Sequence, residues 1–346
     1  MKIGIFVPTI YKLSYPYIGY GGIEPIAGNL AVELAEMGNE VVVFAPKGST
    51  LTDKVKIVET VDANANYHPA HEKAACEIMM EYLRKNFVDI IHCHSHQKFP
   101  YMYYNELKLL NIKVCSTLHN QVNFQNPPPG VSRMNLIGIS NAHCAEASGI
   151  LGIHLECVYN GIDLNNYTYN EKKGDYFLFL SRIGRMKGCH EAIQACKESG
   201  NKLLVAGEDI FVNDPSYVLS IMNSCDGKNI KYLGNISEEK KRELLANARA
   251  LVLPLLWNEP FGLVVIEALA SGTPVITAPR GAMPEIVQHR ISGLFTMNVG
   301  EIKSAMKIVD TIKSEDCRKR AEEFSIRVMS ENYLKLYERI ISGNEW

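Results

Sequence analysis

The sequence predicts an α/β protein built from two doubly wound parallel-sheet domains. Short β-branched runs alternate with amphipathic helical patterns from end to end, which is typical of parallel sheets covered by helices on both faces. The length of 346 residues suits two domains of roughly 100–200 residues each. A polar stretch over residues 159–175 separates two halves with a similar alternation of strand and helix patterns, and we interpret this stretch as the interdomain linker and hinge.

Each half contributes five expected strands, with helices between them. In the first half the strands are 2–7, 41–45, 89–93, 114–118 and 135–139, and the helices lie near 25–37 and 72–85. In the second half the strands are 176–180, 203–206, 230–233, 250–254 and 274–277, and the helices lie near 190–198, 216–224, 238–248 and 261–270. Residues 327–341 form an amphipathic pattern that predicts a helix packed on a domain surface.

Composition excludes several classes of protein. The chain has 36 Lys+Arg and 38 Asp+Glu, so no overall basic field exists to bind nucleic acid. Its longest apolar runs, such as 250–256, are far shorter than the roughly 20 residues of a membrane-spanning helix. The N-terminus reads directly into a strand, unlike a signal peptide, and nine cysteines without a CxxC pair fit a reducing compartment. We therefore expect a cytoplasmic protein.

A glycine-rich loop, Gly19-Tyr20-Gly21-Gly22-Ile23-Glu24, follows the first expected strand and opens a helix. Such a loop lets ligand atoms approach the backbone and offers N–H groups to an anion. It is not the dinucleotide-binding fingerprint, because Glu24 stands where that pattern requires a third glycine. The alternative is a tight turn that binds nothing.

A basic cluster follows the first strand of the second half, in the segment Ser181-Arg182-Ile183-Gly184-Arg185-Met186-Lys187-Gly188. Ligands of open α/β sheets bind at the carboxyl ends of strands, so cations placed there indicate a phosphate-bearing ligand. Arg182 and Lys187 are the candidates. The alternative is that these are solvated surface charges.

The most specific motif runs from Asn258 to Pro274 and contains Glu259 and Glu267 at either end of an expected helix whose first turn holds Pro260. Eight residues at about 1.5 Å rise place the two Cα atoms roughly 12 Å apart, beyond the approximately 5–9.5 Å of glycosidase acid/base pairs. The helix N-terminus between them suits a diphosphate, so a nucleoside diphosphate-sugar would fit, with its sugar near Glu259 and its ribose on Glu267. The alternative is that Glu259 caps the helix and Glu267 lies on its solvated face. The N–H groups expected to face the diphosphate are those of Gly262, Leu263 and Val264.

Three histidines, His92, His94 and His96, alternate at a strand end. If the strand continues past Cys93, their imidazoles share one face and could chelate a transition metal. The alternative is a role other than metal binding at this strand end, and the loop over residues 120–130 follows another such end.

Taken together, these motifs resemble the retaining glycosyltransferases of family 4, the glycosyl transferases group 1. The resemblance covers nearly the whole chain and implies the GT-B fold, in which two Rossmann-like domains face each other across a cleft. It implies an acceptor-side domain over 1–160, a nucleotide-sugar-binding domain over 161–326, and a C-terminal helix, 327–346, packed back on the first domain. Other motifs that carry it are Thr117-Leu118-His119, Asn160-Gly161-Ile162-Asp163, Lys187-Gly188 and Gly281-Ala282-Met283-Pro284-Glu285.

The resemblance also implies roles for single residues. Arg182 and Lys187 would bind the diphosphate and stabilise its departure, Glu259 would contact the donor sugar, and His119 would line the reaction centre. These four are the candidate catalytic residues. The donor-binding set adds Gly21, Gly22, Gly234, Ile236, Phe261, Gly262, Leu263, Val264 and Glu267, with the backbone of 234–236 meeting the base. The acceptor-side set is Glu24, His94, His96 and Asn120, in a pocket that the loop over residues 120–130 would help to shape.

The expected donor is a UDP- or GDP-linked sugar, and no cofactor or metal is expected, because the sequence lacks a DxD-like acidic pair and cations of the chain would stabilise the departing diphosphate. Residues 1–158 carry 12 Lys+Arg and 14 Asp+Glu, which does not favour an anionic membrane. The expected acceptor is therefore a soluble small molecule or glycan. Two rival functions stay open: a nucleotide-sugar epimerase and a catalytically silent nucleotide-sugar-binding subunit.

Overall fold

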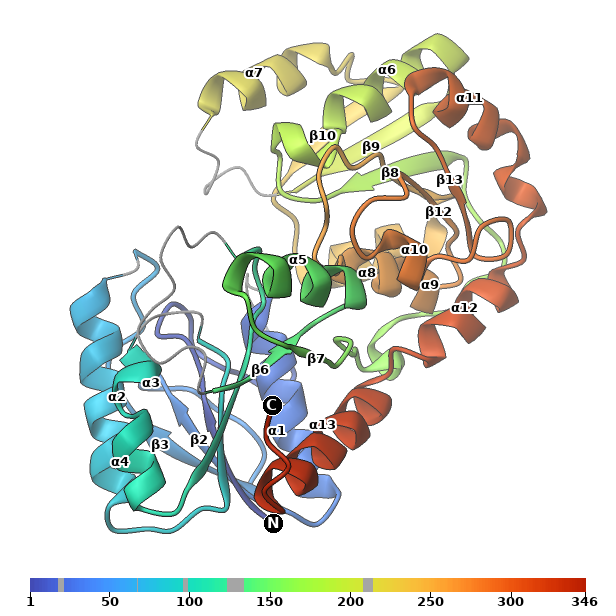
Figure 1. Ribbon diagram of the computed structural model, residues 1–346. Coiled ribbons are helices and arrows are strands. Elements are labelled where there is room, and N and C mark those ends of the chain that lie inside the picture. The colour runs from blue at the N-terminus through green and yellow to red at the C-terminus, as the bar shows by residue number, and fades with distance from the viewer. Residues whose placement is uncertain (18–21, 67, 96–98, 123–133, 208–213) are drawn as a thin grey trace. The chain divides into compact units, whose positions relative to one another are not determined.

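The computed structural model describes residues 1–17, 22–66, 68–95, 99–122, 134–207 and 214–346 (Figure 1). The chain forms two compact units. The first unit comprises Met1–Gly161 and Ile326–Trp346, and the second unit comprises Ile162–Ser325. The chain therefore passes from one unit to the other twice, and the predicted C-terminal helix belongs to the first unit.

The first unit is built on a seven-stranded sheet whose order is β3-β2-β1-β4-β5-β6-β7. All of its pairings are parallel, with Ile5 opposite both Val43 and His92. The central strands are buried on both faces because helices cover them on both sides. The strands are β1 Lys2–Phe6, β2 Glu40–Ala45, β3 Val55–Glu59, β4 Ile90–Cys93, β5 Lys113–Thr117, β6 Asn135–Gly138 and β7 Glu156–Cys157; the helices are α1 Ile23–Glu36, α2 Pro69–Leu83, α3 Phe99–Met102, α4 Tyr104–Leu109, α5 Asn141–Leu151 and α13 Ile326–Ile341.

The second unit repeats this plan with a six-stranded parallel sheet of order β10-β9-β8-β11-β12-β13. In both sheets the strand order reverses beside the first strand, between β1 and β4 and between β8 and β11. Its strands are β8 Tyr176–Leu180, β9 Lys202–Ala206, β10 Ile230–Gly234, β11 Leu251–Leu253, β12 Val275–Thr277 and β13 Gly293–Phe295. Its helices are α6 Cys189–Ser199, α7 Pro215–Ser224, α8 Glu238–Asn247, α9 Leu263–Ala270, α10 Met283–Ile286, α11 Val299–Ile308 and α12 Ser314–Glu322, and its 3₁₀ turns are η2 Leu164–Asn166, η3 Arg185–Lys187 and η4 Val309–Thr311.

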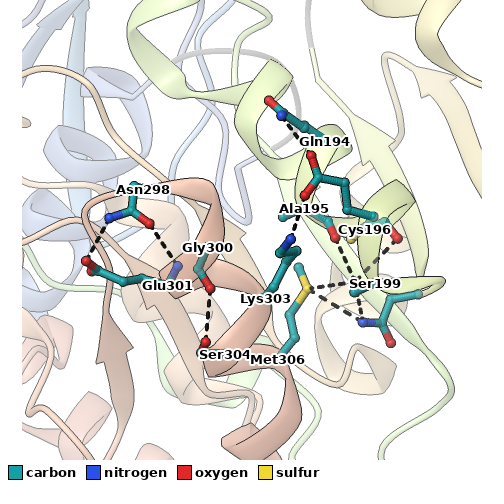
Figure 2. A network of polar contacts seen from close by, with 12 residues as sticks. Gln194, Ala195, Cys196, Ser199, Asn298, Gly300, Glu301, Lys303, Ser304 and Met306 are labelled. Atoms are coloured by element: carbon teal, nitrogen blue, oxygen red, sulfur yellow. Dashed lines mark hydrogen bonds and ion pairs between the residues drawn. The ribbon is translucent and has the colours of Figure 1, made fainter.

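Helices α6 and α11 pack against each other in the second unit through a polar network (Figure 2). The Lys303 ammonium forms an ion pair with Glu198 at 2.6 Å, and the Ser199 hydroxyl donates to the Met306 sulfur at 3.8 Å. Asn298 caps α11 by accepting from the Glu301 backbone N–H at 3.0 Å. The first two contacts join α6 to α11, and the third fixes the start of α11.

From Ile162 on, the polar stretch expected to be a linker and hinge is part of the second unit. Tyr167 and Asn170 bond to helices α9 and α8. The Lys173 ammonium donates to Ala246 O at 3.1 Å, Ser271 O at 3.0 Å and Thr273 Oγ1 at 2.9 Å, and its burial lowers the pKa of that ammonium to about 8. The linker interpretation was wrong for residues 162–175, because this polar segment satisfies backbone carbonyls at the ends of two helices.

Helix α13 lies alongside α1 in the first unit (Figure 1). Its apolar face buries Met329, Tyr333, Tyr337 and Ile340. Two of these side chains are also hydrogen-bonded: Tyr333 OH to Thr117 Oγ1 at 2.9 Å and Tyr337 OH to His92 Nδ1 at 2.6 Å. The amphipathic pattern thus marks a helix that closes the core of the first unit. Within the described residues, no helix is both long and apolar enough to span a bilayer.

Candidate functional site

The candidate site of the second unit lies where strands β8 and β11 end side by side. Parallel neighbours have their carboxyl ends at one edge, and the strand order reverses here, so the loops after these strands meet. Gly188 has φ 75°, and a Cβ there would lie 2.1 Å from the Pro254 carbonyl oxygen. The Leu256 N–H donates to Met186 O at 2.9 Å. Only glycine at 188 permits this close approach, which brings the basic loop against the acidic one.

Lys187, Trp257 and Glu259 form the centre of this site. The Lys187 ammonium forms an ion pair with Glu259 Oε2, and the two side chains are only 14% and 11% exposed. Trp257 Nε1–H donates to the same oxygen at 3.0 Å, and the Lys187 Nζ lies 4.6 Å from the centroid of the indole ring. For Glu259 Oε1, the described residues provide no donor. The arrangement is a paired, largely desolvated charge with one carboxylate oxygen still available.

The backbone of Glu259 is held by the glycine-containing motif near residue 281. Gly281 has φ 56°, and a Cβ there would lie 2.3 Å from Glu259 O and 2.5 Å from Glu259 N. The next residue, Ala282, donates its N–H to Glu259 O at 2.9 Å. This position requires glycine both for its left-handed φ and for space, so the motif fixes where the Glu259 side chain begins.

Helix α9 begins later than the sequence predicts. It starts at Leu263, and Gly262 precedes it with φ 91° and ψ 67°. Pro260 therefore lies before the helix, not in its first turn, because the left-handed Gly262 turns the chain sharply just ahead of α9. In the part of the chain that the structure describes, no side chain caps this end. The N–H groups of Leu263 and Val264 are thus available for an anion.

Glu267 points from α9 toward residues that the sequence did not single out. Its Oε1 accepts from Tyr167 OH at 2.8 Å and from Lys241 Nζ at 3.0 Å, and only 11% of its side chain is exposed. Lys241 also pairs with Glu238 at 2.9 Å. Burial acts to lower the pKa of Lys241, but the two carboxylates outweigh it and raise that pKa. Burial, and then the Glu267 carboxylate, raises the pKa of Tyr167 well above its usual value. Both donors use Oε1, and no described residue donates to Oε2.

The remaining donor-side candidates have different surroundings. The Arg182 side chain is exposed, and no described residue forms a hydrogen bond or ion pair with its guanidinium. Phe261 is buried and packs edge-on against Phe324, with centroids 6.0 Å apart, so only its backbone can reach a ligand. Gly234 ends β10 with φ 66°, and Ile236 lies half-buried just beyond it. Gly22 is exposed at the N-terminus of α1, and Gly21 lies outside the described residues.

In the first unit, Glu24 lies in the first turn of α1 and is only 3% exposed. Burial raises the pKa of its carboxyl to about 7, against the opposing effect of the backbone N–H groups of Glu24 and Ile23. His119 lies just beyond β5 and shares a hydrogen bond of 2.9 Å, Nε2 to Nδ1, with His94. Asn120 is exposed, and its carbonyl accepts from His143 Nε2 at 3.0 Å.

Among the described residues, which include His92 and His94 but not His96, no group of three or more His, Cys, Asp or Glu side chains is placed to hold a metal ion. His92 uses both ring nitrogens, Nδ1 with Tyr337 OH at 2.6 Å and Nε2 with Thr117 Oγ1 at 2.8 Å. This leaves it no lone pair for a metal, and burial lowers its pKa to about 3. His94 stands beside it, with ring centroids 4.1 Å apart, and His96 lies outside the described residues. The chelating interpretation is therefore wrong for His92.

Three residues near the carboxylates were missed by the sequence analysis. Trp257 stands two residues before Glu259, a spacing that could have drawn attention to it. Lys241 follows Glu238 by three residues on a helix, which is usual for a surface ion pair. Tyr167 belongs to the stretch interpreted as a linker, and nothing in the sequence around it indicates a contact with Glu267.

Two parallel-sheet α/β units, the second with paired charges and an uncapped helix N-terminus at the point where its strand order reverses, are the arrangement expected of a glycosyltransferase of the GT-B class. Comparison with known proteins supports this class and gives the family. Residues 166–327 match the model of the glycosyl transferases group 1, and residues 20–166 match that of glycosyltransferase family 4. The chain belongs to this family, and the sequence-based prediction of family and fold class is confirmed.

Similar proteins match over almost the whole chain. The N-acetyl-alpha-D-glucosaminyl L-malate synthase of Bacillus anthracis is 24% identical over 100% of this chain and 96% of its own. The crystal structure of AviGT4, a glycosyltransferase involved in avilamycin A biosynthesis, has a TM-score of 0.75 at 25% identity and covers 100% of this chain and 99% of its own. HepE from Anabaena, in complex with UDP-glucose, has a TM-score of 0.72 at 16% identity over 98% of this chain and 100% of its own, which shows a shared fold.

Proposed function

We propose that this glycosyltransferase moves a sugar from a UDP- or GDP-linked donor to a hydroxyl group of a soluble small molecule or glycan, with retention of the anomeric configuration. The observation that carries the proposal is the buried Lys187–Glu259 pair beside the uncapped N-terminus of α9. The named relatives support it. The B. anthracis synthase is named for an α-linked sugar on L-malate, a small molecule, and HepE is described in complex with UDP-glucose.

The donor-side residues match the charge that the reaction develops. When the anomeric bond breaks, the sugar gains positive charge and the departing diphosphate gains negative charge. The Lys187 ammonium, the exposed Arg182 guanidinium and the N–H groups at the start of α9 would stabilise that leaving group. We propose that these groups suffice and that transfer requires no metal ion. Glu259 Oε1, which the described residues leave free, would accept from donor sugar hydroxyls, and Glu267 Oε2 from the ribose.

Retention sets the path of the proton. The acceptor oxygen would form its bond to the anomeric carbon on the face from which the diphosphate leaves. Its proton would pass to a phosphate oxygen of the leaving nucleoside diphosphate, so that no protein side chain needs to become a covalent nucleophile. We place the acceptor on the side of the first unit, near Glu24, His94 and His119. His119 would line this reaction centre.

Substitutions at the central ion pair test the proposal. We expect Lys187→Ala and Glu259→Gln each to reduce sugar transfer by at least about 100-fold, because each removes electrostatic stabilisation in a desolvated site. The matched controls are Lys240→Ala and Glu243→Gln, which break an exposed ion pair of the same unit and should keep activity within about twofold. Turnover like that of the unmodified protein in either Lys187→Ala or Glu259→Gln would contradict the proposal.

The donor can be identified by thermal shift. UDP, GDP, ADP and their sugars are screened, since a ligand at 100 times its Kd stabilises the folded state by about 2.7 kcal/mol. Mass spectrometry of the donor incubated with the enzyme alone then separates the rival functions. Slow hydrolysis to free sugar supports a transferase, whereas a new epimer would identify an epimerase, and an unchanged donor a silent binding subunit.

A further inference from the structure

Trp257 contacts both members of the central ion pair in two different ways. Its indole N–H donates to Glu259 Oε2 at 3.0 Å, while its ring face lies 4.6 Å from the Lys187 ammonium. An indole N–H can only donate, and the face of its ring attracts a cation. The same side chain thus binds an anion at its edge and a cation at its face.

The geometry gives this tryptophan a specific task at Glu259. The ammonium of Lys187 and the indole N–H converge on one oxygen, Oε2, and leave Oε1 without a donor from the described residues. If the ammonium moves away, the indole N–H still holds Oε2. The carboxylate then keeps its orientation while it loses its neutralising partner.

We propose that Trp257 is a positioning residue that holds the Glu259 carboxylate in place and keeps the Lys187 ammonium beside it until a nucleoside diphosphate takes that ammonium. This inference rests on the proposed function, because it assumes that Lys187 serves the diphosphate and Glu259 the donor sugar. A diphosphate carries more negative charge than one carboxylate and attracts the ammonium more strongly. Its arrival therefore releases Glu259, already oriented, to accept from the sugar.

The size of the effect follows from the kind of bond. A hydrogen bond to a charged group contributes about 1.5–3 kcal/mol, which corresponds to roughly 10- to 150-fold in an equilibrium or a rate. Trp257→Phe removes the N–H and keeps an aromatic face for the ammonium. The loss should therefore appear in sugar transfer and much less in binding of the nucleoside diphosphate alone.

The chain offers a matched control. It has two tryptophans, and the other, Trp346, is also half-buried, donates its indole N–H to Leu136 O at 2.9 Å and lies 4.8 Å from the Arg339 guanidinium. Trp346 belongs to the first unit. Trp346→Phe removes the same N–H and keeps the same kind of ring, but away from the Lys187–Glu259 ion pair.

The first experiment measures two quantities for each variant: kcat/KM with the intact nucleotide-sugar, and the calorimetric Kd of UDP or GDP, whichever raises the melting temperature of the unmodified protein. We expect Trp257→Phe to lower kcat/KM by roughly 10- to 150-fold and to change the Kd by less than about threefold. Trp346→Phe should leave both unchanged. Unchanged kcat/KM in Trp257→Phe, or equal losses in kcat/KM and Kd, would overturn the inference while leaving the proposed function intact. If the unmodified protein transfers sugar from no nucleotide-sugar, the proposed function fails and this inference with it.

A second measurement needs no change at the site. Trp346→Phe leaves Trp257 as the only tryptophan, so its emission reports on the ammonium at its ring face. Titration with the nucleoside diphosphate should change this emission and saturate at the calorimetric Kd. Emission that stays constant while calorimetry records binding would overturn the inference, whether or not Trp257→Phe folds.

Discussion

Replacing Glu24 with glutamine should stabilise the first unit at neutral and alkaline pH and leave its stability unchanged in mild acid. Glu24 is 3% exposed in the first turn of α1, and burial raises the pKa of its carboxyl to about 7 from 4.5. The folded unit therefore holds this proton up to higher pH than the unfolded chain does. Glutamine has a similar shape and is neutral at every pH, so the substitution removes the cost of burying the charge.

The sign and the magnitude follow from linkage. Between pH 4.5 and about 7 the folded state binds more protons at Glu24 than the unfolded state, so the free energy of unfolding decreases as the pH rises. The stabilising contribution of the proton bound to Glu24 is fully present below pH 4.5 and is lost as the pH rises through about 7. At about 1.36 kcal/mol for each pKa unit, the cost above pH 7 is about 3 kcal/mol. Glu24→Gln should recover up to that amount at pH 8 and almost nothing at pH 4.

The assay must follow the first unit alone, because a protein of two units does not guarantee a single unfolding transition. Trp346 lies in that unit, so its emission during denaturant unfolding, in a Trp257→Phe background, reports on it. The control is Glu36→Gln on the same helix, where the carboxylate is 45% exposed and the change should stay below about 1 kcal/mol at both pH values. A gain from Glu24→Gln that is equal at pH 4 and pH 8, or a loss at pH 8, would refute the reasoning.

Two further substitutions test the carboxylates of the second unit. Lys241→Met leaves the buried Glu267 carboxylate without its cation and should destabilise that unit by about 3 kcal/mol, measured by thermal unfolding. The control Lys240→Met removes an exposed cation and should cost less than about 1 kcal/mol. Equal losses of stability in the two variants would contradict the buried pairing. Gly281→Ala places a Cβ 2.3 Å from the Glu259 backbone oxygen at φ 56°, so it should lower kcat/KM by roughly 100-fold by displacing the backbone that carries the Glu259 side chain. The control Gly149→Ala in α5, where a Cβ would meet nothing within 4 Å, should instead stabilise the protein by about 0.5–1 kcal/mol. Full activity in Gly281→Ala would show that the close approach of Gly281 to the Glu259 backbone is not needed.

Much of the fold could be predicted because its central strands are buried on both faces. Strands such as β2, Glu40–Ala45, and β8, Tyr176–Leu180, are continuous apolar runs, and such runs mark parallel sheets. The edge strands β3, Val55–Glu59, β7, Glu156–Cys157, and β13, Gly293–Phe295, were not predicted, and the last two have only two and three residues. Two or three residues are too few to show a period, and backbone pairing with a neighbour, not local preference, creates these strands.

The sequence motifs name the candidate site residues but not the contacts between them. Lys187 and Glu259 could be named from the sequence because each follows a strand end. Their direct pairing across 72 residues depends on β8 and β11 being neighbours, which the chain order does not state. The start of α9 was misplaced because Pro260 suits a first helical turn, whereas the left-handed Gly262 delays the helix. Tyr167 was missed because Glu267, to which its hydroxyl donates, lies 100 residues away in the sequence.

The two passages of the chain between the units lie next to each other. Ile162 N–H donates to Phe324 O at 3.0 Å and forms a parallel bridge with Ser325, so the second unit begins and ends at one point. During synthesis, residues 1–161 emerge first but must wait until the whole second unit has been made before α13 arrives. Until then, Thr117 lacks its hydrogen bond with the Tyr333 hydroxyl and His92 lacks its hydrogen bond with the Tyr337 hydroxyl. The second unit has all of its own residues before α13 is made, so it can complete its fold before the first unit does.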